Sequence, residues 1–450
     1  MRPRLPLGAR LSRAAVLALV SVLCACGFTA AGLSAAPAAS ADEMRSAEYW
    51  LDSEGITKAW EVSKGAGVTV AVIDSGVDGT HQDLAGVLAG GTDVSGAGAP
   101  DGTKGVGVEP VHGTLVASVL AGRGHGTPDP AHPFPNPDGI IGVAPEAQIL
   151  SISAWLGSAN PSGKSIDEQI PAAVRWAVDH GAKVINMSLG STSTAWPQSW
   201  DDAFLYAEQK DVVIVAAAGN RQNGMTQAGA PATIPGVLAV GGLARDGTAS
   251  QDSSTQGISI GVSAAAEGLV GALPGNGYAY WSGSSAATPI VAGVAALIRS
   301  KYPDMSAAQV INRIISTAKP AGSPHPNATY GYGTLDAEAA LTADVPVVTS
   351  NPLGSISDWI TIHRRATAPS TPAPSSEPAA PPSSADSVPA ATTPAALAPA
   401  QLDSPLAPAL VLGFSFLLLA ILAGGAIHLV IVGRRGRGAP GGESSGPEGS

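Results

Sequence analysis

Short apolar runs alternate with amphipathic stretches between residue 43 and about residue 344. The apolar runs are rich in β-branched residues and comprise VTVAVID, QILSIS, KVINMS, DVVIVAAA and GVLAVGG. Helical periodicity lies between several of them, in stretches such as DEQIPAAVRWAVDHG and WDDAFLYAEQK. Continuous apolar strands separated by amphipathic helices are typical of a parallel sheet with helices on both faces. The pattern therefore predicts a three-layer α/β domain whose functional groups lie in loops beyond the carboxyl ends of the strands.

Longer apolar runs stand on both sides of this domain. The first follows four arginines within residues 1–13 and ends in the small residues of AASA, which is typical of a secretory signal peptide cut after Ala41. The second, 408–432, would extend about 37 Å as a helix and could cross a hydrocarbon core of about 30 Å. The arginines of GRRGRG follow it directly and mark the cytoplasmic side. We therefore expect a single-pass protein of the cell membrane, with an extracellular domain and a cytoplasmic tail.

Between the domain and the second apolar run the chain consists mainly of Ala, Pro, Ser and Thr. Residues 366–405 hold ten prolines and almost no large apolar side chain, so they cannot bury enough surface to fold and should form an extended stalk. The expected organisation is a signal peptide over 1–41, a globular domain over 42–345, a Pro-rich linker over 346–405, a transmembrane helix over 406–433 and a tail over 434–450.

Charge and cysteine content narrow the class of protein. The net charge of −11 and the sequence pI of about 5.1 argue against nucleic acid as a partner. Both cysteines, Cys24 and Cys26, lie within the expected signal peptide, so a chain cut after Ala41 has no disulfide. A lipid-modified Cys26 is the alternative, which the local sequence LCAC fits only loosely.

Four polar residues end predicted strands or begin predicted helices. Asp74 ends the first strand, His112 begins the helix of HGTLVASVLAG, and Asn220 follows the strand that ends in AAAGN. Ser285 lies in SGSSAATP, at the start of a long apolar helix. Each has an ordinary interpretation by itself, because Asp and Asn favour turns and Ser and His often stand at helix N-termini.

Together these residue types are those that nucleophilic acyl transfer requires, and we expect them at one edge of the sheet. A serine hydroxyl is a poor nucleophile until an imidazole takes its proton, and the imidazole needs a carboxylate to fix its tautomer. An amide and a backbone N–H beside the serine would donate to the oxygen of the tetrahedral intermediate. This chemistry requires no cofactor.

The motifs also resemble a known family. The order Asp, His, Asn, Ser, in the contexts VAVIDSGV, HGTLVAS, AAAGN and SGSSAATPIVAGVAAL, is similar to that of the subtilisin-like serine proteases, peptidase family S8, from about residue 49 to 341. The resemblance implies that Asp74 orients the imidazole of His112, which acts as base and acid. It implies that Ser285 attacks the peptide bond and that Asn220 completes the oxyanion hole.

The same resemblance implies a substrate-binding segment. In this family an extended peptide pairs with a short backbone strand, which corresponds here to Ser188, Leu189 and Gly190. Gly229 resembles the position that lines the pocket for the side chain before the cut, where a glycine leaves room for larger side chains. We therefore expect proteins or peptides as substrates.

The order of parts along the whole chain resembles the mycosins, membrane-anchored proteases associated with type VII secretion in actinobacteria. The shared features are a signal peptide, too few residues before the domain for a folded propeptide, a Pro-rich stalk, one span and a short basic tail. Mycosins usually carry disulfides in this domain, and the present chain departs from them because its domain has no cysteine. The resemblance implies a type VII secretion membrane complex as a partner. The alternative is a structural component of such a complex that has a protease fold but no essential turnover.

Calcium is common in subtilisin-like domains, and oxygen ligands for it occur in two places. Asp83 lies in HQDL, and Asp129, Asn136 and Asp138 lie in the insertion GHGTPDPAHPFPNPDG. An exposed loop rich in Pro and Gly is the alternative for this insertion. A structural calcium ion is thus a hypothesis, and we assign no metal ligand.

Overall fold

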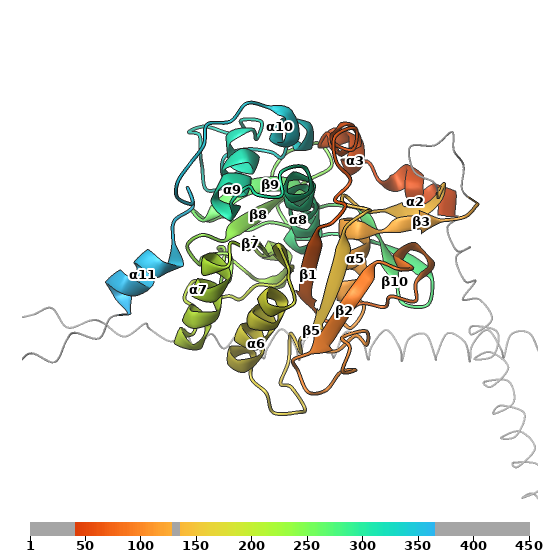
Figure 1. The fold of residues 1–450 in the computed structure, drawn as a ribbon, viewed down its shortest axis with the longest axis horizontal. Helices are drawn as coiled ribbons and strands as arrows, with labels where there is room; N and C mark the ends of the chain where they lie inside the picture. Colours follow the sequence, from red (N-terminus) through yellow and green to blue (C-terminus); the bar gives the residue numbers. More distant parts are fainter. Residues whose placement is uncertain (1–40, 128–135, 365–450) are drawn as a thin grey trace, which may run out of the picture. The chain divides into compact units, whose positions relative to one another are not determined.

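The computed structural model describes residues 41–127 and 136–364 (Figure 1). All of them belong to the first of the two units into which the chain divides, residues 1–371. Within these described ranges no helix is both long and apolar enough to cross a membrane. The predicted signal peptide up to residue 40, the Pro-rich stalk, the transmembrane helix and the tail lie outside the described residues.

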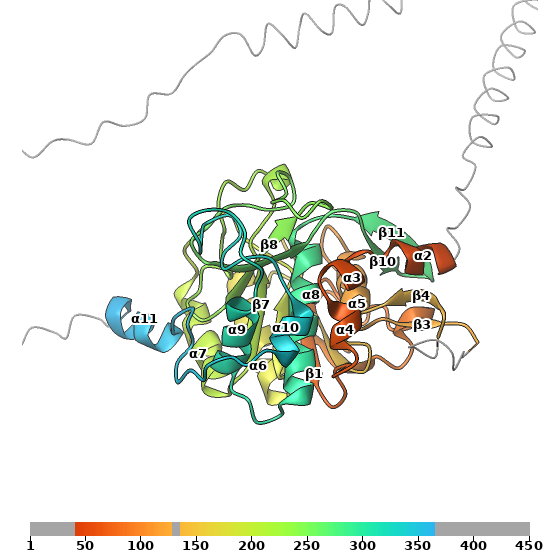
Figure 2. The ribbon, with the colours of Figure 1, turned by 90° about the horizontal axis from the view of Figure 1, so that it is seen from above.

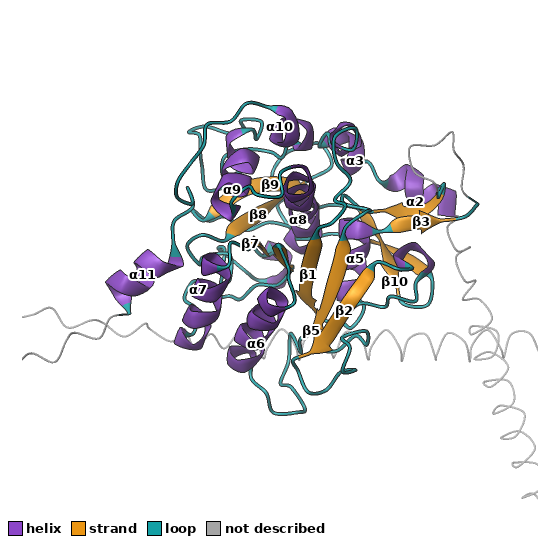
Figure 3. Ribbon diagram, in the orientation of Figure 1, coloured by secondary structure: helices purple, strands orange, loops and turns teal. Residues whose placement is uncertain are grey.

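A sheet of seven parallel strands forms the centre of the domain (Figure 3). Its strand order is β2-β5-β1-β6-β7-β8-β9, so β1 lies between β5 and β6 and the chain crosses over repeatedly between neighbours. Two short antiparallel pairs, β3 with β4 and β10 with β11, stand outside it. The strands are β1 (Thr69–Asp74), β2 (Leu88–Asp93), β3 (Arg123–His125), β4 (Asp138–Ile141), β5 (Gln148–Ser153), β6 (Val184–Met187), β7 (Val213–Ala217), β8 (Leu238–Leu243), β9 (Ile260–Ala265), β10 (Leu269–Leu273) and β11 (Gly277–Trp281).

Helices cover both faces of the sheet (Figures 1 and 2). One face carries α3 (Trp50–Ser53), α4 (Ile56–Ala59), α5 (His112–Ala121), α8 (Ser284–Lys301), α9 (Ala307–Ser316) and α10 (Ala337–Thr342). The other face carries α6 (Ile166–Asp179), α7 (Asp201–Gln209) and α11 (Ile356–His363). In both views α2 (Ala41–Ala47) lies at the opposite end of the described domain from α11. Three turns of 3-10 helix complete the elements of the described ranges: Gln82–Leu84, Gln198–Trp200 and Arg221–Asn223.

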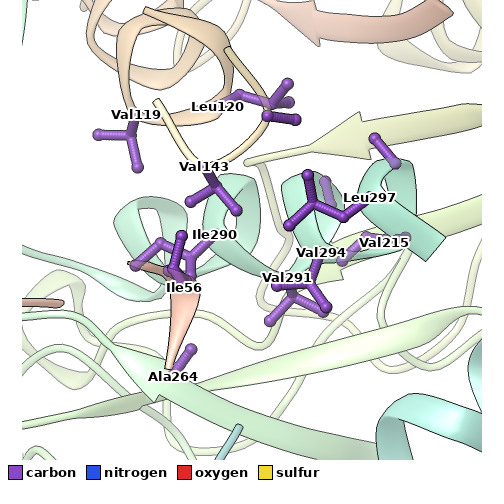
Figure 4. Close-up of a cluster of buried hydrophobic side chains, with 14 of the residues drawn as sticks. Ile56, Val119, Leu120, Val143, Val215, Ala264, Ile290, Val291, Val294 and Leu297 are labelled. Atoms are coloured by element: carbon purple, nitrogen blue, oxygen red, sulfur yellow. The ribbon is translucent and has the colours of Figure 1, made fainter. Parts of the chain in front are cut away.

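The core sits in two layers because the strand side chains alternate in direction. On β1, Val70 and Val72 pack into the layer beneath α5 and α8, whereas Ala71 and Ile73 pack into the layer beneath α6 and α7. Helix α8 is buried from Ser284 to Arg299, as expected for a helix that is apolar on every side. Figure 4 shows side chains of α8, among them Ile290, Val294 and Leu297, gathered with buried residues of α5 and the sheet. Burial of each large aliphatic side chain contributes roughly 1.5–3 kcal/mol, which anchors the start of α8 firmly.

The predicted α/β class is therefore present, with differences at the edges. Each of the five predicted apolar runs forms a strand of the sheet, but β2 and β9 were not predicted. Both are edge strands, and their sequences, LAGGTD and IGVSAA, are rich in small residues and lack a continuous β-branched run.

The end of the domain also differs from its predicted place at residue 345. The chain remains packed on the domain to residue 364, because Ile356 of α11 is 2% exposed and belongs to the α6–α7 core layer. Glu208 of α7 accepts hydrogen bonds from Ser355 Oγ, at 2.9 Å, and from the Ile356 N–H, at 3.0 Å. Residues 346–364 therefore belong to the folded body, although the predicted linker begins at 346.

Candidate active site

Asp74 and His112 are hydrogen-bonded to each other, because the end of β1 and the start of α5 lie side by side. Asp74 is the last residue of β1, and its side chain is 1% exposed. His112 is the first residue of α5, and its Nδ1 lies 2.8 Å from Asp74 Oδ1 and 3.0 Å from Oδ2. The next turn is tied in as well, because the Ser75 N–H donates to Asp74 Oδ1 at 2.7 Å and the Gly113 N–H donates to Ser75 Oγ at 2.9 Å. The carboxylate thus holds the imidazole with Nδ1 as donor, which leaves Nε2 as the proton acceptor.

The surroundings of His112 change its pKa in two directions. Burial lowers the pKa of the imidazole, whereas the charge of Asp74, its hydrogen bond and the charge of Glu109 raise it, and the net pKa lies above the usual 6.5. The ring of Trp281 meets the imidazole edge to face, with centroids 5.5 Å apart and planes at 86°. The imidazole is therefore held from two sides and is 15% exposed.

Asn220 and the start of α8 hold each other in place. Asn220 lies just beyond β7, and its Oδ1 accepts hydrogen bonds from the Ser284 N–H, at 2.7 Å, and from Ser284 Oγ, at 2.9 Å. Ser284 Oγ accepts in turn from the Gly219 N–H at 2.9 Å. These bonds fix the orientation of the Asn220 amide. Among the described residues its Nδ2 has no protein acceptor and is therefore free to donate to a ligand.

Ser285 Oγ shares a small space with the Asn220 amide. Gly283, the residue before α8, has a φ of 147°, and a β-carbon added to it would lie 2.9 Å from Asn220 Nδ2 and 3.0 Å from Ser285 Oγ. A side chain at 283 would fill this space, so glycine keeps it open. The Ser285 N–H is in the first turn of α8, where helix N–H groups lack intrahelical partners and the potential is positive.

One cleft of about 870 Å³ contains all four of these residues. Its lining includes Asp74, His112, Asn220 and Ser285, together with Ser188, Leu189 and Gly190 of the predicted substrate-binding segment. The segment is tied to the serine, because Ser188 Oγ donates to the Ser285 carbonyl at 2.8 Å and accepts from Asn186 Nδ2 at 3.0 Å. The structure thus brings seven of the eight predicted site residues together.

Gly229 differs from its predicted place in the pocket. It is buried and does not line the cleft, whereas its neighbour Ala230 does. A β-carbon on Gly229 would overlap the carbonyl oxygen of Ser191, and the Ala230 N–H donates to the Ser193 carbonyl at 2.8 Å. Glycine is therefore required here by the close approach of two backbones, and it does not leave space for a substrate side chain.

The cleft also has lining residues that sequence reasoning missed. Ile166, Asp167 and Gln169 belong to α6, and most of the others come from loops that carry no recognised motif. The apolar loop residues include Val106, Val108, Trp155, Leu156 and Met225. Hydrophobic periodicity could not find them, because each stands in a loop outside the strands and helices. Exposure of an apolar side chain could have indicated these residues, as for Val108, which is 57% exposed, but exposure is known only from the structure.

Both carboxylate oxygens of Asp83, one of the residues considered for calcium, already have protein donors. Asp83 is fully buried, and its Oδ1 accepts from His125 Nδ1 at 2.6 Å. Its Oδ2 accepts from the Ile140 N–H and from the Tyr278 hydroxyl, both at 2.9 Å. Arg45 donates to the nearby carbonyl oxygens of Asn136, Asp138 and Gly139.

Asp129 lies outside the described residues. In the ranges 41–127 and 136–364 no group of three or more His, Cys, Asp or Glu side chains is arranged to hold a metal ion. The imidazole of His125 thus donates to Asp83, and the guanidinium of Arg45 donates to the carbonyl oxygens nearby. Oxygens that already accept from these two groups do not fit a calcium ion.

A parallel sheet with a histidine, an aspartate and a serine in one cleft at its edge defines a serine hydrolase of the α/β class. The model of the subtilase family matches residues 65–333, which is more than half of the chain. Subtilisin DY of Bacillus licheniformis is 38% identical over 281 residues, which cover 62% of this chain and 92% of the relative. The chain therefore belongs to the subtilase family and is a subtilisin-like serine endopeptidase.

Solved structures of mycosins are similar in fold. MycP1 with its N-terminal propeptide removed is 30% identical with a TM-score of 0.54, over 67% of this chain and 98% of that chain. The MycP3 protease from the type VII (ESX-3) secretion system is 33% identical with a TM-score of 0.54, over 66% of this chain and 88% of that chain.

Proposed function

We propose that this chain is an exported, membrane-anchored serine endopeptidase that hydrolyses peptide bonds through Asp74, His112 and Ser285. The observation that carries the proposal is the 2.8 Å hydrogen bond between His112 and Asp74 in the cleft that also contains Ser285 and Asn220. Three residues from distant parts of the sequence meet there, and they supply the three groups that acyl transfer needs: a carboxylate, a base and a nucleophile.

The proposed reaction has two halves. His112 Nε2 takes the proton of Ser285 Oγ as the oxygen attacks the peptide carbonyl, and Asp74 stabilises the imidazolium that forms. Asn220 Nδ2 and the Ser285 N–H donate to the oxyanion of the tetrahedral intermediate. His112 then gives the proton to the leaving amine, which leaves an acyl group on Ser285. Water, activated by the same imidazole, releases the acyl group and restores the serine.

Burial of Asp74 favours this assignment. A carboxylate that is 1% exposed and accepts from both the imidazole and the Ser75 N–H has a fixed position beside the imidazole, as the orienting partner of the base requires. The proposed chemistry uses no metal or other cofactor.

The proposed location and partner come from the whole chain. An N-terminal signal pattern, a Pro-rich stretch, an apolar run over 408–432 and a basic tail support an extracellular domain on a single membrane span. Similarity to the MycP1 and MycP3 structures supports an association with a type VII secretion membrane complex. The substrates in this proposal are proteins or peptides outside the cell.

Replacement of the nucleophile tests the function directly. A fluorophosphonate probe should label the wild-type protein at Ser285 and should not label Ser285→Ala, because the probe reacts with an activated serine. Ser282→Ala is the matched control: Ser282 is exposed, three residues away and outside the cleft lining, so this variant should label normally. Labelling of a different hydroxyl in the wild type would contradict the proposal.

The same variant separates proteolysis from a structural role in secretion. N-terminal mass spectrometry of surface and secreted proteins should find cleavage products in cells with the wild-type chain and not in cells with Ser285→Ala. If secretion is normal with Ser285→Ala but lost on deletion of the whole chain, the structural component without essential turnover is the correct account.

A further inference from the structure

Two backbone segments flank Ser285 and form a slot in the cleft. Ser188–Gly190 lies on one side, where Ser188 Oγ is bonded to the Ser285 carbonyl. Ala217–Asn220 lies on the other side, where Asn220 is bonded to Ser284. A peptide carbonyl attacked by Ser285 Oγ with its oxygen toward Asn220 has its own α-carbon one bond away. That α-carbon belongs to the residue directly before the cut bond, so the slot between the two segments is within reach of its side chain.

Met225 fills this slot. A β-carbon on Gly219 would overlap Met225 Cε and lie 2.6 Å from Sδ, and a β-carbon on Gly190 would lie 3.6 Å from the same Cε. The end of the thioether therefore lies between the two glycines, one from each wall. Met225 is partly buried and lines the cleft. Since neither glycine has a side chain, the methionine methyl occupies the space that the two glycines would otherwise leave open.

The backbone holds Met225 in this position through a tight turn. Asn220 is followed by the 3-10 turn Arg221–Asn223 and by Gly224, whose φ is +79°. The Met225 N–H then returns to the Asn220 carbonyl at 3.4 Å. Gly219, with a φ of +104°, has no side chain and so lets the thioether lie against its α-carbon. The residue that fills the slot and the amide that faces Ser285 are thus parts of the same turn.

We infer that Met225 is a specificity-determining residue, which restricts the residue before the cut bond to a short side chain such as alanine or serine. This inference rests on the proposed function, because it places the scissile carbonyl at Ser285. The mechanism is steric: a large side chain and the methionine methyl cannot occupy one slot, and displacement of the thioether would give up its contacts on both walls.

Peptides that differ in one residue test this inference. Two chromogenic peptides are compared, identical except for alanine or phenylalanine directly before the cleaved bond. The wild type should prefer alanine, and Met225→Gly should shift the ratio of kcat/KM toward phenylalanine by at least about 10- to 200-fold, the range that a single methylene contributes in an apolar pocket. A residue that merely supported the fold would lower both rates alike and leave the ratio unchanged.

Two matched variants complete the experiment. Met225→Leu keeps the side-chain volume and should retain the preference for alanine. Gln227→Ala lies on the same loop but is exposed and outside the cleft lining, so both rates should stay at the wild-type level. Melting curves of all variants check that the fold is kept.

The outcomes separate the two proposals. An active enzyme whose alanine-to-phenylalanine ratio is the same in the wild type and in Met225→Gly overturns the role of Met225 alone, as does a wild type that prefers phenylalanine. Failure of the wild type and of every variant to cleave either peptide, or to react with the fluorophosphonate, overturns the proposed function together with this inference.

Discussion

The cleft has a catalytic end and a pocket end, and the fold holds them in different ways. At the catalytic end each residue stands at or beyond the end of a strand or in the first turn of a helix, and hydrogen bonds fix the side chains of Asp74, His112 and Asn220. At the pocket end the walls are glycine backbone and the filling side chain comes from a loop. The catalytic end comprises Asp74, His112, Asn220 and Ser285, and the pocket end comprises Gly190, Gly219 and Met225.

This difference separates reaction from selectivity. The ends of parallel strands and the starts of α5 and α8 are fixed by two buried core layers, so the catalytic side chains have little freedom. Met225 has three rotatable side-chain bonds and lies on a loop, so substitution there changes the slot without moving the sheet. Changes at the catalytic end should therefore lower the rate for all peptides alike, whereas changes at the pocket end should reorder the peptides.

The largest effect is expected from His112→Ala. Loss of the base, the acid and the partner of Asp74 together should lower kcat by about 10⁶-fold, which is the loss known for a subtilisin, with equal effect on the alanine and phenylalanine peptides. His180→Ala is the control, because that histidine is exposed and stacks on Trp176 away from the cleft. Near-normal turnover by His112→Ala would show that another group is the base.

A smaller loss is expected from Asn220→Asp. The aspartate keeps an oxygen for the Ser284 N–H and so preserves the start of α8, but it has no donor for the oxyanion. We expect kcat to fall by at least about 10²- to 10³-fold with little change in KM, a magnitude known for loss of this kind of donor in a subtilisin. Gln222→Ala, an exposed change on the adjacent turn, should have no effect. If Asn220→Asp and Gln222→Ala lowered kcat and the melting temperature to the same extent, the effect would come from a disturbed turn and not from the lost donor.

The pH dependence of kcat/KM should report His112. As the base, the imidazole must be neutral, and its pKa in the free enzyme is raised above 6.5, so the acid limb of the profile should lie at a pH above 6.5. Removal of a raising charge must move the limb to lower pH. Glu109→Gln should therefore shift it downward while the rate on the plateau stays high, because Glu109 contributes the least of the raising interactions. A limb that moves upward would contradict this electrostatic account.

Sequence reasoning reached the catalytic end and, of the pocket end, only Gly190, for a physical reason. Asp74 and Asn220 could be placed because Asp74 ends an apolar strand and Asn220 lies just beyond another, and the carboxyl ends of parallel strands meet at one edge. Gly229 could not be interpreted from its type, because the approach of the Ser191 carbonyl that requires a glycine there is a contact between two loops. The same holds for Met225, whose role depends on the path of the turn after Asn220 and on two glycines remote from it in sequence.

The end of the domain shows the same limit. Residues after 345 have no strand or long helical pattern, yet α11 returns to the domain next to the cleft. Trp359 of α11 lies against Trp196 with ring centroids 4.4 Å apart. Arg364 Nε donates to Asp201 Oδ2 at 2.8 Å, while the Trp196 indole donates to Oδ1 of the same carboxylate at 2.7 Å. These contacts fix the segment 195–200, of which Ala195, Pro197 and Trp200 line the cleft.

The smallest effect on catalysis is expected from Trp359→Ala, which removes the contact between α11 and Trp196. Loss of the aromatic pair should loosen the wall of the cleft and raise KM by about 2- to 10-fold, as expected for a contact of about 0.5–1.5 kcal/mol, with kcat unchanged. Ile362→Ala is the control on the same helix, because Ile362 is 72% exposed and should affect neither parameter. A lower melting temperature with an unchanged KM would mean that α11 stabilises the domain without shaping the cleft. A higher KM for both peptides, in the same ratio as in the wild type, would distinguish this distant wall from the slot that Met225 fills.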